Sequence, residues 1–146
     1  MSVVSSDADS DANPGANARA TPFETLGGEA GVYALVGRFY DLMDSLPEFA
    51  ALRALHPASL DNSRQRLFWF LCGWTGGPNH YVRNVGEPML RARHLAVPIG
   101  VAQRDQWLDC MQRAMVGVGV DAALQVRLAQ SFAGTADWMR NRAEAP

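Results

Sequence analysis

Residues 29–45 read EAGVYALVGRFYDLMDS, and this stretch decides the fold class. Its large apolar side chains recur every three or four positions, which is the period of an α-helix with one buried face. The residues on that face are Val32, Leu35, Val36, Phe39, Leu42 and Met43. The spacing predicts a long amphipathic helix that follows the Gly27-Gly28 pair and ends near Ser45.

Helical signals continue on both sides of this stretch. Residues 23–26 are predicted to form one helical turn, which the glycine pair stops. Pro47 suits the first turn of a short helix ending near His56-Pro57, because the residue before a proline is biased away from helical geometry. A second long helix is predicted from Asp61 until Gly76-Gly77-Pro78 breaks it.

The second half of the chain predicts two more long helices, at about residues 101–118 and 121–142. Between them and the second long helix, residues 79–100 contain Gly86, Pro88 and Pro98, which predict a mostly irregular segment with a short helix at 88–94. No alternating run predicts a strand and no repeat is present, so the fold class is all-α. We expect one domain at 21–146, preceded by a disordered tail at 1–20 that is rich in Ser, Asp, Ala and Asn.

The composition excludes several function classes. Thirteen Lys and Arg against fifteen Asp and Glu give a net charge of -2, which does not suit the neutralisation of nucleic-acid phosphates. No apolar run reaches the roughly 20 residues of a membrane span, and residues 1–20 have no basic lead and no apolar stretch, so we do not expect them to be a secretory signal. Cys72 and Cys110 are too few for a disulfide framework and lie in apolar segments, which favours the cytoplasm.

The chain has three histidines, His56, His80 and His94, and one histidine suffices to hold a haem iron from one side. Spacing alone selects none of them. Taken by residue type only, each is more often an ordinary surface or core residue whose ring nitrogens are hydrogen-bonded.

From about Thr21 to near its end, the chain resembles the group II truncated haemoglobins. The matching pieces are Gly27-Gly28, Arg38-Phe39-Tyr40, Gly76-Gly77-Pro78, Arg91-Ala92-Arg93-His94, Arg104-Asp105-Gln106-Trp107-Leu108 and Cys110-Met111. The resemblance implies a two-over-two sandwich of helices around haem b. It also implies that His94 is the proximal ligand of the iron.

Further haem contacts follow from the same resemblance. It places Arg93 and Tyr81 near the propionates, where a guanidinium makes charge-assisted hydrogen bonds to carboxylates. It places Phe39, Leu67, Phe70 and Met111 in the apolar walls, although each of these is equally typical of ordinary core packing. For Arg91, three positions before His94, we expect simple solvation.

On the opposite face, the resemblance places five residues around the bound ligand: Tyr40, His56, Ser63, Leu67 and Trp107. Three of them offer hydrogen-bond donors, namely the Tyr40 phenol, the Trp107 indole and the His56 imidazole. Within this family a tyrosine is also common at the position of His56. Two sets of donors therefore stay open for the ligand: a pair formed by Tyr40 and a second tyrosine, or Tyr40 together with histidine and Trp107. A core tyrosine bonded to the backbone also remains an alternative for Tyr40.

Two classes of function follow. The first is a protein that binds dioxygen, and also nitric oxide or carbon monoxide, with strong distal hydrogen bonding, for scavenging, sensing or storage. The second is a redox enzyme, either a nitric oxide dioxygenase or peroxidase-like, that draws electrons from a separate reductase. A third alternative is a helical domain that has lost haem and acts by protein contact. A monomer or homodimer is expected in each case.

Overall fold

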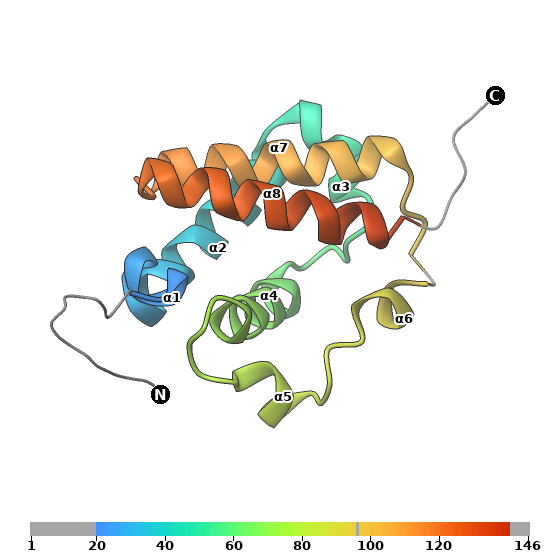
Figure 1. The fold of residues 1–146 in the computed structure, drawn as a ribbon. Coiled ribbons are helices and arrows are strands. Elements are labelled where there is room, and N and C mark those ends of the chain that lie inside the picture. The colour runs from blue at the N-terminus through green and yellow to red at the C-terminus, as the bar shows by residue number, and fades with distance from the viewer. Residues whose placement is uncertain (1–19, 96, 141–146) are drawn as a thin grey trace, which may run out of the picture.

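The computed structural model describes residues 20–95 and 97–140, and every regular element in those ranges is helical (Figure 1). This confirms the all-α prediction. The elements are α1 (Pro22–Leu26), α2 (Gly28–Ser45), the 3-10 turn η1 (Pro47–Phe49), α3 (Ala50–Arg53), α4 (Asp61–Trp74), α5 (His80–Asn84), α6 (Leu90–His94), α7 (Val101–Gly117) and α8 (Ala122–Trp138).

The chain enters the fold through a sharp corner between α1 and α2. Thr21 and Glu24 form a capping box, in which each side chain accepts a hydrogen bond from the other's backbone N–H. Gly27 ends α1 with φ of 103°, a left-handed conformation that glycine adopts without a steric penalty. Where the helices meet, a Cβ added to Gly31 would lie 1.7 Å from the Leu26 carbonyl oxygen, so only glycine fits.

Four long helices form two layers of two. Helix α2 packs on both α4 and α7, and α7 packs along α8, beside which it lies in Figure 1. The core between the layers is apolar: Phe39 and Met43 of α2, Met111 and Met115 of α7 and Leu124 of α8 are at most 2% exposed. The two-over-two prediction is therefore confirmed in the arrangement of the helices.

Two details differ from the expected elements. Residues 80–84 form a helix inside the segment predicted to be mostly irregular, and a second short helix begins at Leu90. Helix α8 ends at Trp138, before the expected end near Arg142, which lies outside the described residues. The predicted tail also lies outside them, apart from Ala20, so its disorder stays a prediction.

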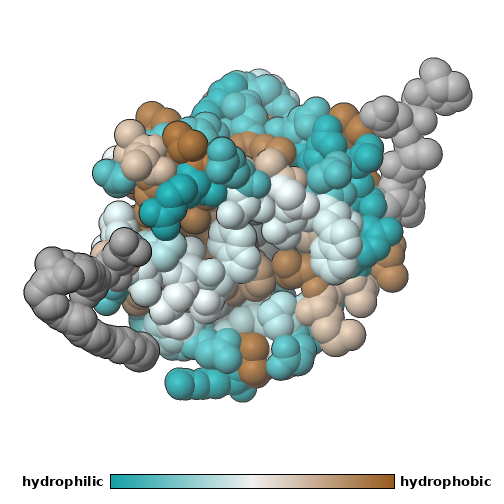
Figure 2. Space-filling model, viewed as in Figure 1, coloured by the Kyte–Doolittle hydropathy of each residue, from teal (hydrophilic) through white to brown (hydrophobic). Residues whose placement is uncertain are grey.

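The face shown in Figure 2 mixes hydrophilic residues with small groups of hydrophobic ones. None of the helices in the described ranges combines the length and the apolar composition that a membrane crossing requires.

Candidate functional site

His94 is the last residue of α6 and its side chain is half-buried. Its Nδ1 lies 2.7 Å from the carbonyl oxygen of Leu90. A carbonyl oxygen only accepts, so Nδ1 carries the proton and Nε2 of the neutral ring carries the lone pair. A metal-binding imidazole is oriented in this way by a hydrogen bond from its other nitrogen.

Helix α6 has only five residues, and Arg91 ties it to the far end of the chain. Arg91 Nη1 donates to the carbonyl oxygens of Trp138 at 2.6 Å and of Arg140 at 2.9 Å. Those carbonyls lie at the C-terminal end of α8, where backbone acceptors lack helical partners. The expectation that Arg91 is merely solvated was wrong, because its guanidinium anchors the helix that carries His94.

Arg93 and Tyr81, the two residues predicted to contact the propionates, lie together. Tyr81 of α5 is 8% exposed, and the Arg93 guanidinium carbon lies 5.8 Å from the centre of its ring. Arg93 donates from Nε and Nη2 to the carbonyl oxygen of Glu87, which leaves other guanidinium N–H donors for a carboxylate. The Phe70 ring of α4 meets Tyr81 edge-on at 6.2 Å.

Tyr40 of α2 and Trp107 of α7 both pack against Phe39. The ring centres are 5.0 Å apart for Phe39 and Tyr40, and 5.3 Å apart for Phe39 and Trp107. No described residue forms a hydrogen bond with the Tyr40 hydroxyl or with the Trp107 indole N–H. Neither of these two atoms is fully enclosed by the protein. Both donors are therefore available for a hydrogen bond to a bound molecule.

Arg64 covers the ring of Tyr40 from α4. Its guanidinium carbon lies 5.7 Å from the ring centre, and it donates to the carboxylate of Asp41 at 2.8 Å. Burial raises the pKa of the Tyr40 phenol well above its usual value of 10, and the nearby Arg64 charge opposes this only in part. Tyr40 therefore keeps its proton and remains a hydrogen-bond donor at physiological pH.

His56 lies in the loop that follows α3, against the edge of Tyr40. The two ring centres are 5.8 Å apart, and His56 Nδ1 lies 3.0 Å from the carbonyl oxygen of Leu52. Burial lowers the pKa of His56; the bond to Leu52 opposes this, while the charges of Arg53 and His94 lower the pKa further.

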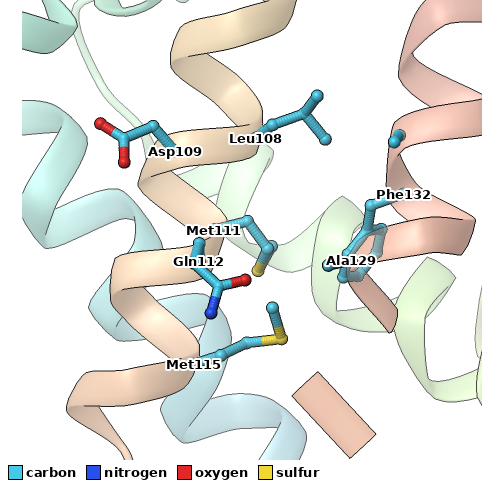
Figure 3. A pocket seen from close by; sticks show the side chains of 8 residues that line it. Leu108, Asp109, Met111, Gln112, Met115, Ala129 and Phe132 are labelled. Carbon is cyan, nitrogen blue, oxygen red and sulfur yellow. The ribbon is translucent and has the colours of Figure 1, made fainter. Parts of the chain in front are cut away.

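The predicted wall residues divide between two regions. Ser63, Leu67 and Phe70 lie on α4 and are half-buried, and Phe70 and Tyr81 both line a hollow of about 220 Å³. Met111 is buried on α7 and instead lines a different hollow, of about 260 Å³, between α7 and α8. Figure 3 shows Met111 and Met115 directed toward Phe132 of α8 across this second hollow.

A continuous series of ring contacts joins the two predicted halves of the site. Trp107 meets Phe132 at 5.2 Å, Phe132 stacks on Trp74 at 4.8 Å, and Trp74 stacks on Phe70 at 6.2 Å. With the contacts of Phe39 and Tyr81 described above, aromatic rings extend from the Tyr40 side to the Arg93 side. Three rings of this series, those of Phe70, Trp74 and Tyr81, line the hollow of about 220 Å³, and such aromatic walls suit a flat, largely apolar macrocycle with charged substituents at one edge.

The metal-binding chemistry of this site depends on one imidazole. Within residues 20–95 and 97–140, no three His, Cys, Asp or Glu side chains gather in a way that could hold a bare metal ion. A haem needs only one axial protein ligand, which His94 offers through Nε2. The residues present therefore fit haem: an oriented imidazole, aromatic side chains, a cation beside Tyr81 and two donors that bond to no described residue.

The supporting roles of four polar residues were missed in the sequence: Arg53, Arg64, Arg91 and Gln106. Arg53 donates to backbone atoms of residues 57 and 58, which follow it closely in the sequence. An arginine shortly before the Pro57 turn could therefore have indicated these bonds. Gln106 accepts from the backbone of Leu52, and Arg64 donates to Asp41, across 54 and 23 positions respectively. No local pattern could have revealed those two contacts.

Comparison with known proteins gives consistent matches. The family described as Bacterial-like globin matches residues 21–141. The Group 2 truncated hemoglobin YjbI of Bacillus subtilis (strain 168) is 37% identical over 124 residues, which cover 85% of this chain and 91% of that protein. The group II 2-on-2 hemoglobin of Agrobacterium tumefaciens has a similar structure, with a TM-score of 0.84, 44% identity and coverage of 87% and 98% of the two chains. The truncated oxygen-avid haemoglobin of Bacillus subtilis gives a TM-score of 0.77 at 36% identity, covering 84% of this chain and all of that one.

Proposed function

The chain belongs to the bacterial-like globins, as a group II truncated haemoglobin, and we propose that it binds dioxygen tightly and releases it slowly. Membership of this family makes it a haem globin that binds small ligands. The proposal concerns which ligand it handles, which residues hold that ligand and for what purpose. We assign it scavenging, sensing or storage of dioxygen, with nitric oxide and carbon monoxide as further ligands.

On the proximal side, we assign His94 the role of axial ligand to haem b. The Leu90 carbonyl holds the ring so that Nε2 offers its lone pair, and Arg91 fixes the helix on which the ring lies. The iron of the bound haem supplies reversible coordination of diatomic molecules. Arg93 and Tyr81 then contact the propionates, while Phe39, Leu67, Phe70 and Met111 contribute apolar surface around the macrocycle.

On the distal side, we assign Tyr40 and Trp107 as the hydrogen-bond donors to the ligand. The observation that carries this proposal is that the two rings pack at adjoining positions against Phe39 while neither donor bonds to a described residue. Ser63 and Leu67 of α4 complete this face, Ser63 with a small polar side chain and Leu67 with an apolar one. A donor aimed at a partly negative oxygen in a water-poor pocket stabilises it by about 1–3 kcal/mol, or about tenfold in affinity per 1.4 kcal/mol.

A related protein supports the direction of this assignment. The Bacillus subtilis haemoglobin that shares 36% identity with this chain is described as oxygen-avid. Two donors that each slow release fit scavenging, sensing or storage better than rapid delivery, because the ligand leaves only after both hydrogen bonds break.

Stopped-flow measurement of oxygen release tests the proposal. We expect Tyr40→Phe and Trp107→Leu each to release oxygen about tenfold faster than the wild type, because each variant loses one donor. Tyr33→Phe and Trp138→Leu are matched controls, since these side chains are 70% and 61% exposed, and both should release oxygen at the wild-type rate. Equal rates in the wild type and the two pocket variants would refute the proposed donors.

Kinetic measurements on the wild-type protein distinguish reversible binding from redox turnover. If the chain oxidises nitric oxide repeatedly, it must receive electrons from a separate reductase, which steady-state consumption in the presence of a candidate reductase would reveal. Stoichiometric reaction without turnover supports the binding role. We further propose that the chain acts in the cytoplasm, which its two buried and unpaired cysteines support, and that it is a monomer or homodimer.

A further inference from the structure

The loop that carries His56 is held by an arginine from the preceding helix. Arg53 donates to the carbonyl oxygens of Pro57 at 2.9 Å and Ala58 at 2.8 Å, and it also reaches that of His56 at 3.4 Å. Its Nε donates to the carboxylate of Asp44 on α2 at 2.9 Å. One guanidinium therefore fixes three backbone carbonyls of this loop relative to α2.

A second contact fixes the same loop from α7. The side-chain oxygen of Gln106 accepts a hydrogen bond from the backbone N–H of Leu52 at 3.0 Å. Leu52 is 3% exposed, and its carbonyl oxygen is the partner of His56 Nδ1. Leu52 thus connects Gln106, which directly precedes Trp107, with the imidazole of His56.

These contacts determine which nitrogen of His56 carries the proton. The Leu52 carbonyl can only accept, so Nδ1 donates. Burial lowers the pKa of His56, which keeps the ring neutral near pH 7. A neutral ring with its proton on Nδ1 has a lone pair on Nε2, so that atom can accept a hydrogen bond but cannot donate one. This differs from the expectation of a third donor beside Tyr40 and Trp107.

We propose that His56 supplies the ligand pocket with its hydrogen-bond acceptor, and that Arg53 and Gln106 are the positioning residues that hold it in that role. The inference rests on the proposed function, because it takes Tyr40 and Trp107 as the donors of the same pocket. A pocket with two donors and one acceptor binds two classes of ligand. The donors favour ligands that only accept hydrogen bonds, and the acceptor favours ligands that carry their own N–H, O–H or S–H group. His56 thereby broadens the ligand class beyond dioxygen and carbon monoxide.

Nitrogen NMR of ¹⁵N-labelled histidines tests the tautomer directly. In both the haem-free chain and the carbon monoxide complex, we expect the His56 signals of a ring protonated at Nδ1. A ring protonated at Nε2 in both samples overturns the inference. If haem fails to bind at all, the proposed function fails, while the haem-free spectrum still reports the tautomer, so the two failures are distinguishable.

Ligand binding to the ferric protein tests the acceptor role. Free-base ammonia presents only N–H donors once its lone pair is used in ligation, whereas fluoride presents only acceptor lone pairs. We expect His56→Phe to weaken ammonia binding about fivefold and to leave fluoride binding unchanged. Tyr40→Phe, the matched control, should weaken fluoride binding only. Weaker fluoride binding in His56→Phe, or unchanged ammonia binding, overturns the proposal.

The positioning role requires a readout that general destabilisation would not change. We expect Gln106→Met, which lacks the acceptor oxygen, to mix the two His56 tautomers in the NMR spectrum, and Gln106→Glu to restore the single Nδ1-protonated form. Arg53→Met should have the same effect, whereas Asp44→Asn keeps the three loop bonds and should not. A single Nδ1-protonated form in both Gln106→Met and Arg53→Met removes these two residues from the proposal.

Discussion

Arg91 and Trp138 lie 47 positions apart in the sequence, yet the Arg91 guanidinium donates to the Trp138 carbonyl oxygen at 2.6 Å. The same nitrogen donates to the carbonyl of Arg140, so one side chain joins the start of α6 to the end of α8. In Figure 1, α6 lies beside the end of α8, where the chain finishes its last long helix. The position of His94 therefore depends on the last helix of the fold as well as on its own.

We predict that Arg91→Met lowers the free energy of unfolding by about 1.5–3 kcal/mol, because charge-assisted bonds to two carbonyls are lost. Arg127→Met, which alters an exposed arginine of α8, is the matched control and should change stability by less than about 0.5 kcal/mol. Urea unfolding followed by circular dichroism measures both. Equal stabilities of the two variants would contradict the anchoring role of Arg91.

His94→Ala should abolish the haem Soret band while the far-ultraviolet circular dichroism of the helices persists. The reason is that this substitution removes the assigned axial ligand from a half-buried position at a helix end, not from the core between the layers. His80→Ala is the control: His80 pairs with Glu29 and stacks on Phe68, so its loss should leave the Soret band intact. A normal Soret band in His94→Ala would show that another residue holds the iron.

Gly31→Ala and Gly134→Ala should shift stability in opposite directions. The new Cβ at residue 31 would overlap the Leu26 carbonyl oxygen, so the backbone would have to shift. This shift should lower the free energy of unfolding by about 1–3 kcal/mol or more. At residue 134, within α8, nothing lies within 4 Å of the new Cβ, so alanine should stabilise the helix by up to about 1 kcal/mol. Thermal unfolding would record a lower midpoint for the first variant and a higher one for the second.

Both cysteines should resist thiol reagents until the protein unfolds. Burial raises the pKa of the Cys72 thiol to about 11 and that of Cys110 to about 12, with smaller contributions from the charges of Glu29 and Asp109 respectively. Both residues are also fully buried, so thiolate is scarce and access is blocked. Ellman's reagent at pH 8 should detect no thiol in the native protein and two in denaturant. Rapid reaction of either cysteine in the native state would contradict this.

The stability of the protein should fall below pH 6.5, partly because of His56. Its folded-state pKa lies below the usual value of 6.5, so in this range the unfolded chain binds more protons than the folded one. Stability therefore rises with pH through this window and is lost as the pH falls through the folded-state pKa. We expect a shallower slope in His56→Gln, measured by urea unfolding at several pH values between 5 and 7. Identical slopes would show that His56 does not contribute.

The long helices could be predicted because their signals are local. In α2 the periodic apolar face and the Gly27-Gly28 pair lie within the helix or next to it, and the structure buries that face. Helix α5 escaped prediction because its five residues are too few for a periodic pattern and, unlike residues 23–26, they are not followed by a glycine pair that marks the end of a turn. Its formation depends on packing against α4, which sequence spacing does not encode.

The site was predictable in a different way. His94 could not be selected from three histidines by spacing, and its assignment came from the resemblance of several ordered motifs to one family. The tautomer of His56 was beyond reach, since it depends on the distance from its ring to one carbonyl oxygen. The role of Arg91 was also hidden, because its partners are backbone atoms at the other end of the domain.

Helix α6 spans five residues, well below the roughly 12 that an isolated helix needs to be even marginally stable in water. Its order must therefore come from contacts outside itself, such as the bonds of Arg91 to the end of α8 and, in the function proposed above, a haem held by His94. Any ligand that binds only the folded chain stabilises it, by about 2.7 kcal/mol at a hundred times its dissociation constant. The amount of folded protein in a cell should accordingly follow the supply of haem, and chains made during haem shortage should be the first exposed to proteolysis.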